Sequence, residues 1–104
     1  MTRKQALTEL IEKVEAGDRS ASLRDTPLKG NGGLYEGALN GSLDAAKALH
    51  DAVLPGWIGY ADTTGFAWLY EDENESQTQS ALIPSNPARA WLLAILRALH
   101  AMEA

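Results

Sequence analysis

Residues 42–57 read SLDAAKALHDAVLPGW, a stretch in which a helix is expected to lead directly into a strand. Ser42 stands at an N-cap position, where its hydroxyl can accept a hydrogen bond from a backbone N–H two or three residues further on. An apolar stripe follows at helical spacing: Leu43, Ala46, Leu49 and Val53. Pro55 forces the residue before it out of helical geometry, and Gly56 supplies the turn. The stretch predicts a short connection from helix to strand and requires no catalysis.

A β-hairpin is predicted directly after this connection. Residues 57–62 (WIGYAD) and 65–70 (GFAWLY) have the composition of strands, and a tight turn at 63–65 would join them as antiparallel neighbours. Residues 79–83 (QSALI) are a candidate third strand. Three aromatic side chains alternate along the second strand and should point to one side: Phe66, Trp68 and Tyr70. Such a row could be a platform on which bases or other rings stack.

We expect instead that the aromatic row forms the inner face of the sheet, covered by helices. The large rings expected in the core are Trp57, Phe66, Trp68 and Trp91. Burial of each would contribute on the order of 2 to 3 kcal/mol to folding, which explains them better as core than as site.

Amphipathic helices are predicted at both ends of the chain. Over residues 3–16 the apolar side chains fall on one face, and Thr2 and Gln5 have the spacing of a capping box. A second, stronger pattern begins at Pro87, with Asn86 as its N-cap. The order of helix, irregular segment, helix, two or three strands and helix predicts an α+β fold in a single domain, 1–104.

Composition and charge limit the classes of function. The chain has 104 residues, a formal net charge of −5, a sequence pI of about 4.9 and no cysteine. Because nucleic-acid binding depends on lysine and arginine, direct binding to DNA or RNA is not expected. The absence of cysteine and of a long apolar stretch predicts a cytoplasmic protein that does not enter a membrane.

Residues 18–41 form a glycine-rich segment with few apolar anchors, which we expect to be irregular. Within it we expect residues 20–33 to be mobile. Leu34, Tyr35 and Leu39 could form a short strand or one helical turn. The GNGG sequence could expose backbone N–H groups to phosphate, but the buried strand that normally precedes such a loop is missing. We therefore interpret the glycines as a surface loop.

Residues 71–80 (EDENESQTQS) are predicted to be an acidic loop between strands. Its carboxylates are the densest negative patch of the chain and our candidate for contact with a partner: Glu71, Asp72, Glu73 and Glu75. The tract lacks the glycine and the ligand spacing of a calcium-binding loop, so no metal site is expected in it.

The sequence contains no recognisable catalytic, cofactor or metal motif, and we expect no catalytic residues, cofactor or metal. Its two histidines, His50 and His100, lie on different helices without a partner at metal-ligand spacing. Both are interpreted as residues of a helix surface or a helix end.

Two stretches together resemble the phage ABA sandwich domain family. GSLDAAKALHDAVLPGW (41–57) is similar to the family's SLDAA…LxPxGW segment, and NPARAWLLAILRALHA (86–101) to its closing TPARALLxAxLRA helix, with asparagine in place of threonine before Pro87. The resemblance implies an α-β-α sandwich, with a small antiparallel sheet of two to four strands between about three helices. It also implies a phage or prophage origin, in the cytoplasm of a bacterial host, and no established activity.

Three functions stay open. The first is a non-enzymatic accessory protein that binds a macromolecule, such as a host defence component, because acidic charge suits a basic partner surface. The second is a protein that binds or sequesters a signalling nucleotide, which needs a pocket where Arg19, Arg24 or Lys29 meets aromatic rings and glycine backbone. An enzyme is the third and the least favoured.

Overall fold

The computed structural model describes residues 2–20, 22–71 and 77–103, which form four helices and three strands. The elements in chain order are α1 (Arg3–Ala16), α2 (Gly32–Leu39), α3 (Leu43–Val53), β1 (Ile58–Ala61), β2 (Phe66–Tyr70), β3 (Thr78–Leu82) and α4 (Pro87–Met102). The α+β class, the two end helices and all three predicted strands are confirmed, with strand ends shifted by one residue.

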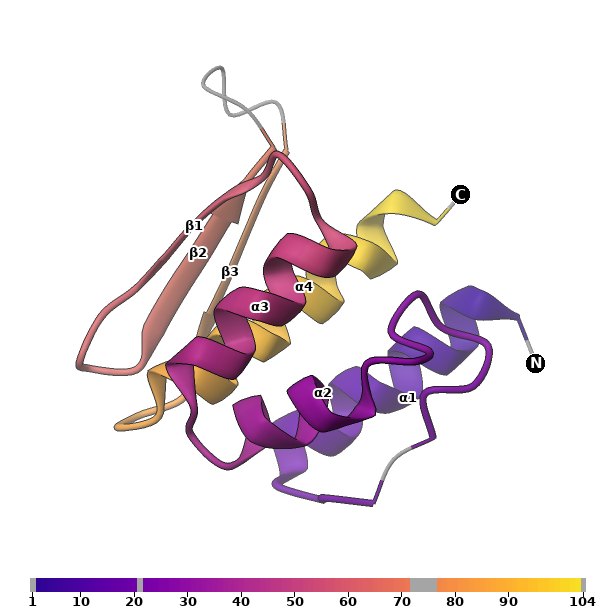
Figure 1. Cartoon of the computed structure of the whole chain (residues 1–104), viewed down its shortest axis with the longest axis horizontal. Coiled ribbons are helices and arrows are strands. Elements are labelled where there is room, and N and C mark those ends of the chain that lie inside the picture. Colours follow the sequence, from indigo (N-terminus) through magenta and orange to yellow (C-terminus); the bar gives the residue numbers. More distant parts are fainter. Residues whose placement is uncertain (1, 21, 72–76, 104) are drawn as a thin grey trace.

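The three strands form an antiparallel meander in the order β1-β2-β3. Tyr60 pairs with Trp68 across β1 and β2, and Trp68 pairs with Ser80 across β2 and β3. Helix α4 contacts all three strands and the three other helices. Figure 1 shows the sheet on one side of the molecule and every helix on the other, so that the helices cover only one face of the sheet.

The predicted helix starts are confirmed by their caps. In α1 the Thr2 hydroxyl accepts from the N–H of Gln5 at 3.1 Å, and the Gln5 side chain accepts from the N–H of Thr2 at 2.9 Å. The Ser42 hydroxyl accepts from the N–H of Ala45 at 3.1 Å, which fixes the start of α3 as expected from the sequence. Asn86 caps α4 in the same way.

The core is built around α4, which is buried on almost every side. Its buried residues are Ala88, Ala90, Leu92, Leu93, Ala94, Ile95, Leu96, Ala98 and Leu99. Ala67 and Leu69 of β2 face this helix and are both fully buried. Small residues on the covered side of the sheet let the helix lie close to it. Among the described residues, no helix is long and apolar enough to cross a bilayer.

The expectation that the β2 aromatics are core residues is wrong. Phe66, Trp68 and Tyr70 do point to one side, but they are only partly buried and lie on the face opposite α4. The predicted alternation of side chains along β2 is correct, but the face expected to be covered, the one with Phe66, Trp68 and Tyr70, is the uncovered one. Because side chains alternate with a period of two, an error of one residue exchanges the two faces of the sheet. Trp57 and Trp91 do pack against the core, as partly buried residues at its margin.

The expectation that residues 18–41 have few apolar anchors is also wrong. Leu28 is fully buried, and its N–H donates to the hydroxyl of Thr26, which is itself 5% exposed. Of the two conformations considered for Leu34, Tyr35 and Leu39, the structure has the helical one, in α2. The segment folds as turns followed by a helix, because Leu28 and Tyr35 fill the core beneath it.

Candidate functional site

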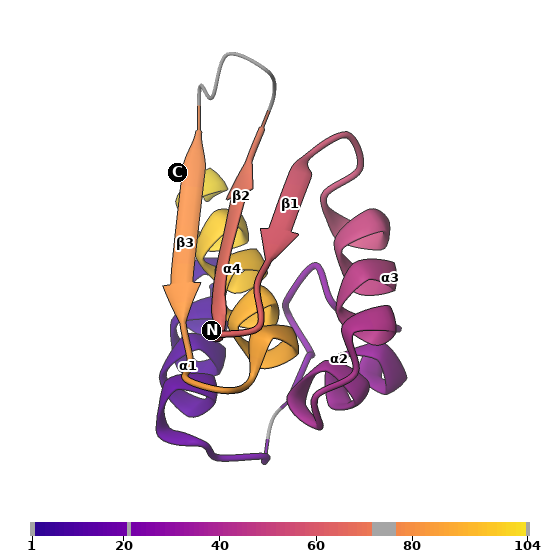
Figure 2. The same ribbon diagram turned by 90° about the vertical axis from the view of Figure 1, so that its left-hand side faces the viewer.

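The most distinctive surface of the molecule is the uncovered face of the sheet, which we call the open face. Its residues follow from the strand register and are Ile58, Tyr60, Phe66, Trp68, Tyr70, Thr78, Ser80 and Leu82. Figure 2 looks onto this face, and no helix crosses in front of it. Tyr60 is 50% exposed and Leu82 59% exposed, which places two large apolar side chains in solvent on one side of the sheet.

The aromatic rings of the open face stack on one another across the strands. The ring of Tyr60 stacks on Trp68, with centroids 5.2 Å apart, and on Tyr70, with centroids 6.1 Å apart. Phe66 continues the row with its centroid 5.1 Å from that of Trp68. The open face is therefore a ridge of rings whose faces are largely turned toward one another.

None of the residues in the three strands carries a formal charge. Acidic residues lie where the strands end: Asp62 after β1 and Glu71 after β2, both exposed. The Thr64 hydroxyl donates to the carboxylate of Asp62, and this bond is the main cause that holds the Asp62 pKa below its usual range. The open face is thus uncharged at its centre and negative at its ends.

The predicted acidic tract is only partly described. The N–H of Glu71 donates to the carbonyl of Gln77 at 3.0 Å and continues the β2–β3 hairpin beyond the strands. Asp72, Glu73 and Glu75 lie outside the described residues. Because the tract joins the ends of β2 and β3, it is connected directly to the open face.

Within the described part of the chain, a single arginine, Arg97, donates a hydrogen bond to the edge strand β3. The guanidinium of Arg97 donates to the carbonyl of Ser80 at 2.6 Å and to the carboxylate of Glu15 at 3.2 Å. A charged side chain on the edge of β3 protects an edge strand from pairing with another chain. The positive charge is also balanced by Glu15, so it adds little to the potential at the open face.

Of the two positions expected for the histidines, a helix surface or a helix end, His50 has the second: it is in the last turn of α3, and it is buried, with only 3% of its surface exposed. Its Nε2 lies 2.8 Å from the carbonyl oxygen of Trp57, and its Nδ1 lies 3.1 Å from Nε1 of Trp91. His100 lies at the end of α4 with its Nε2 3.1 Å from the Thr8 hydroxyl. Both histidines therefore connect elements of the fold.

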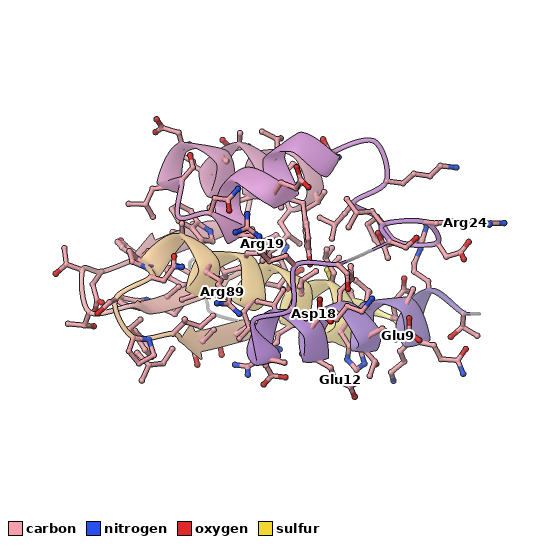
Figure 3. All side chains as sticks on the ribbon, turned by 90° about the horizontal axis from the view of Figure 1, so that it is seen from below. Glu9, Glu12, Asp18, Arg19, Arg24 and Arg89 are labelled. Atoms are coloured by element: carbon pink, nitrogen blue, oxygen red, sulfur yellow. The ribbon has the colours of Figure 1, made fainter. Side chains whose placement is uncertain are left out.

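The three basic residues named for a nucleotide pocket do not come together. Arg19 lines a hollow beside α2 together with Gly32 and the ring of Tyr35, as that hypothesis required of one arginine. Arg24 and Lys29 are exposed and do not line it. Figure 3 shows Arg24 directed outward, apart from Arg19. No cluster of three or more potential metal ligands exists among residues 2–20, 22–71 and 77–103.

Sequence reasoning missed Tyr60 and Leu82 as surface residues of interest. The signal for Tyr60 was present: a hairpin with its turn at 63–65 places Tyr60 opposite Trp68.

Comparisons with family models, with curated proteins and with solved structures found no match.

Proposed function

We propose that this chain is a non-enzymatic binding protein and that it docks a partner protein on the open face of its sheet. The observation that carries the proposal is the uncovered row of aromatic rings, with Tyr60 and Leu82 at least half exposed. Exposed apolar patches are rare on monomeric proteins and mark interaction sites, and aromatic residues dominate the energetics of protein interfaces.

A protein partner fits the open face better than a nucleobase or a sugar. Flat ligands stack on free ring faces, whereas Tyr60 already stacks on Trp68 and Tyr70. The ridge offers ring edges and the side chain of Leu82, against which the apolar side chains of a protein can interdigitate. Its lack of charged side chains lets a partner dehydrate the centre of the contact at little cost.

The acidic residues at the strand ends favour a partner whose apolar patch is bordered by lysine or arginine. Asp62 and Glu71 supply this negative charge, and the acidic tract that follows Glu71 increases it. Such a rim governs the rate of association more than the affinity. By the resemblance to phage proteins, a defence component of a bacterial host is the first partner to test.

A photo-crosslinking experiment tests the location of the contact. A benzophenone amino acid is introduced at Tyr60 on the open face or, as the control, at Leu43 on α3, which is 46% exposed. We expect one discrete crosslinked partner from position 60 and none from position 43 in a bacterial host. A partner that crosslinks equally from both positions, or only from position 43, contradicts the proposal.

A further inference from the structure

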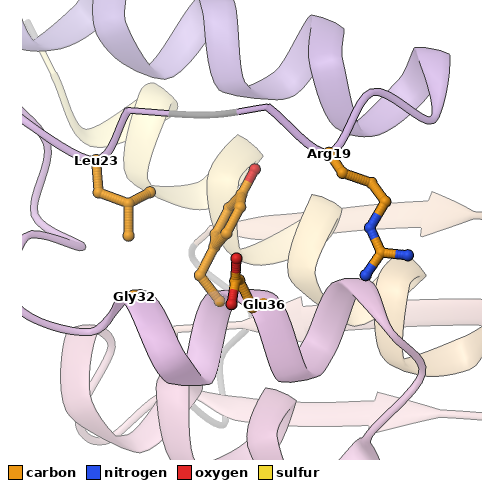
Figure 4. Close-up of a pocket in the computed structure, with 5 residues that line it drawn as sticks. Arg19, Leu23, Gly32 and Glu36 are labelled. Atoms are coloured by element: carbon orange, nitrogen blue, oxygen red, sulfur yellow. The ribbon is translucent and has the colours of Figure 1, made fainter.

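A second feature, separate from the open face, is the hollow beside α2. It has a volume of about 290 Å³ and is lined by Arg19, Leu23, Gly32, Tyr35 and Glu36. Figure 4 shows Glu36 on α2, between Leu23 and Arg19, which extend from the facing segment. This volume is at the lower end for ligand pockets, so it suits a small molecule.

The hollow is lined by one positive side chain, Arg19, and one negative side chain, Glu36, which do not form an ion pair with each other. No ion pair within the described part of the chain joins Arg19 or Glu36 to another residue. The Arg19 guanidinium donates one hydrogen bond to the side chain of Asn40 and has other N–H groups available. The walls therefore offer the guanidinium donors of Arg19 and, apart from them, the carboxylate of Glu36, both on exposed residues.

Tyr35 lines the hollow and carries a buried hydroxyl that is not satisfied by any described residue. The residue is 2% exposed, and its hydroxyl has no hydrogen-bond partner among the described residues. A buried hydroxyl without a partner costs about 1 to 3 kcal/mol, so buried polar groups are normally paired. Helix α2 also begins at Gly32 without a capping side chain.

We infer that this hollow binds a small zwitterion, specifically a free α-amino acid with an apolar side chain. The α-carboxylate would face the Arg19 guanidinium, and the α-ammonium the Glu36 carboxylate. The apolar side chain would pack on Leu23 and the Tyr35 ring. A nucleotide fits less well, because Glu36 would repel its phosphates and neither Arg24 nor Lys29 reaches the hollow.

The test is an NMR titration of the ¹⁵N-labelled protein with L-leucine. We expect the amide signals of Leu23, Gly32 and Glu36 to shift saturably at millimolar leucine. N-acetyl-leucine lacks the ammonium and leucinamide lacks the carboxylate, so each should bind about tenfold more weakly or worse. The absence of shifts, or equal binding of all three compounds, overturns the inference.

Matched variants locate the binding. Arg19→Gln and Glu36→Gln should each weaken leucine binding about tenfold or more, because each removes one charge-assisted contact. Lys29→Gln and Glu12→Gln each remove a charge of the same sign outside the hollow and should leave the binding unchanged. If Glu36→Gln binds leucine as well as the parent protein does, the site is not the one inferred here. None of these outcomes depends on the open face.

Discussion

The indole N–H of Trp91 donates to Nδ1 of His50 across 3.1 Å, and this contact connects helix α4 to helix α3. Because Nδ1 accepts this hydrogen bond, the ring proton of a neutral His50 is on Nε2, which donates to the carbonyl of Trp57 at 2.8 Å. A buried histidine thus fixes the connection from α3 to β1. The first role of the 42–57 stretch is to position the sheet on the helices.

Two substitutions at Trp91 distinguish the contribution of this hydrogen bond to stability from the contribution of packing. Trp91→Phe should lower the free energy of unfolding by about 1 kcal/mol, because it removes the indole donor and keeps an aromatic ring. Trp91→Ala should cost about 2 to 4 kcal/mol, less than a fully buried tryptophan would, since Trp91 is partly buried. Urea unfolding followed by circular dichroism measures both. Equal effects of the two substitutions would mean that packing contributes nothing.

Tyr35 should make stability fall at alkaline pH. Burial raises the pKa of its phenol to about 12. Between pH 10 and 12 the unfolded chain has released a proton that the folded chain retains, so a rise in pH favours unfolding by up to about 1.4 kcal/mol per pH unit. Tyr35→Phe should remove this slope and, near pH 7, be neutral or stabilising, because the lost hydroxyl has no partner. Parallel stability curves of the two proteins from pH 9 to 11.5 would refute this account.

Gly65 is required by the turn between β1 and β2. A Cβ there would lie 1.9 Å from the carbonyl oxygen of Ile83, and the backbone has φ +99°. Gly56 also has positive φ, +87°, but open space around it, so Gly56→Ala isolates the backbone strain at about 1 kcal/mol. Gly65→Ala should cost at least about 2 kcal/mol more, because the Ile83 backbone must move. Similar thermal midpoints for the two variants would contradict the close approach.

The sequence predicted the elements well, because their signals are local. Capping residues and apolar periodicity located α1, α3 and α4, and a turn glycine located the hairpin. It could not assign the faces of the sheet. Alternation says that Phe66 and Leu69 point to opposite sides, but which side is covered depends on where α4 packs.

The sites were less predictable because they depend on distant contacts. The open face needs Tyr60 and Leu82 brought beside Trp68, which the register of two hairpins decides. The hollow beside α2 forms only when Arg19 and Glu36 lie on the same side of the molecule. This placement depends on turns between them that the sequence did not predict. The burial of Leu28, which anchors that segment, has no periodic signal around it.

The acidic tract should control how fast the partner associates. Neutralising Glu71, Asp72, Glu73 and Glu75 to their amides should slow association severalfold at low salt, and the difference should vanish at high salt. The thermal midpoint should barely change if the tract is the solvated loop that the sequence predicts, since exposed charges add little to folding. Stopped-flow or surface binding kinetics with the crosslinked partner measure this. Neutralising Glu9 and Glu12 on α1 is the control, and an unchanged rate for the quadruple variant would return the tract to a solvated loop.

The most direct measurement is the affinity of the purified crosslinked partner for variants of exposed apolar residues. Tyr60→Ser and Leu82→Ser remove side chains from the open face, whereas Leu43→Ser and Met102→Ser remove side chains of comparable exposure from α3 and α4. We predict that each open-face variant loses at least about tenfold in affinity, equal to about 1.4 kcal/mol, and that the helix variants bind like the parent. Equal affinity of all four variants would show that the open face does not bind the partner.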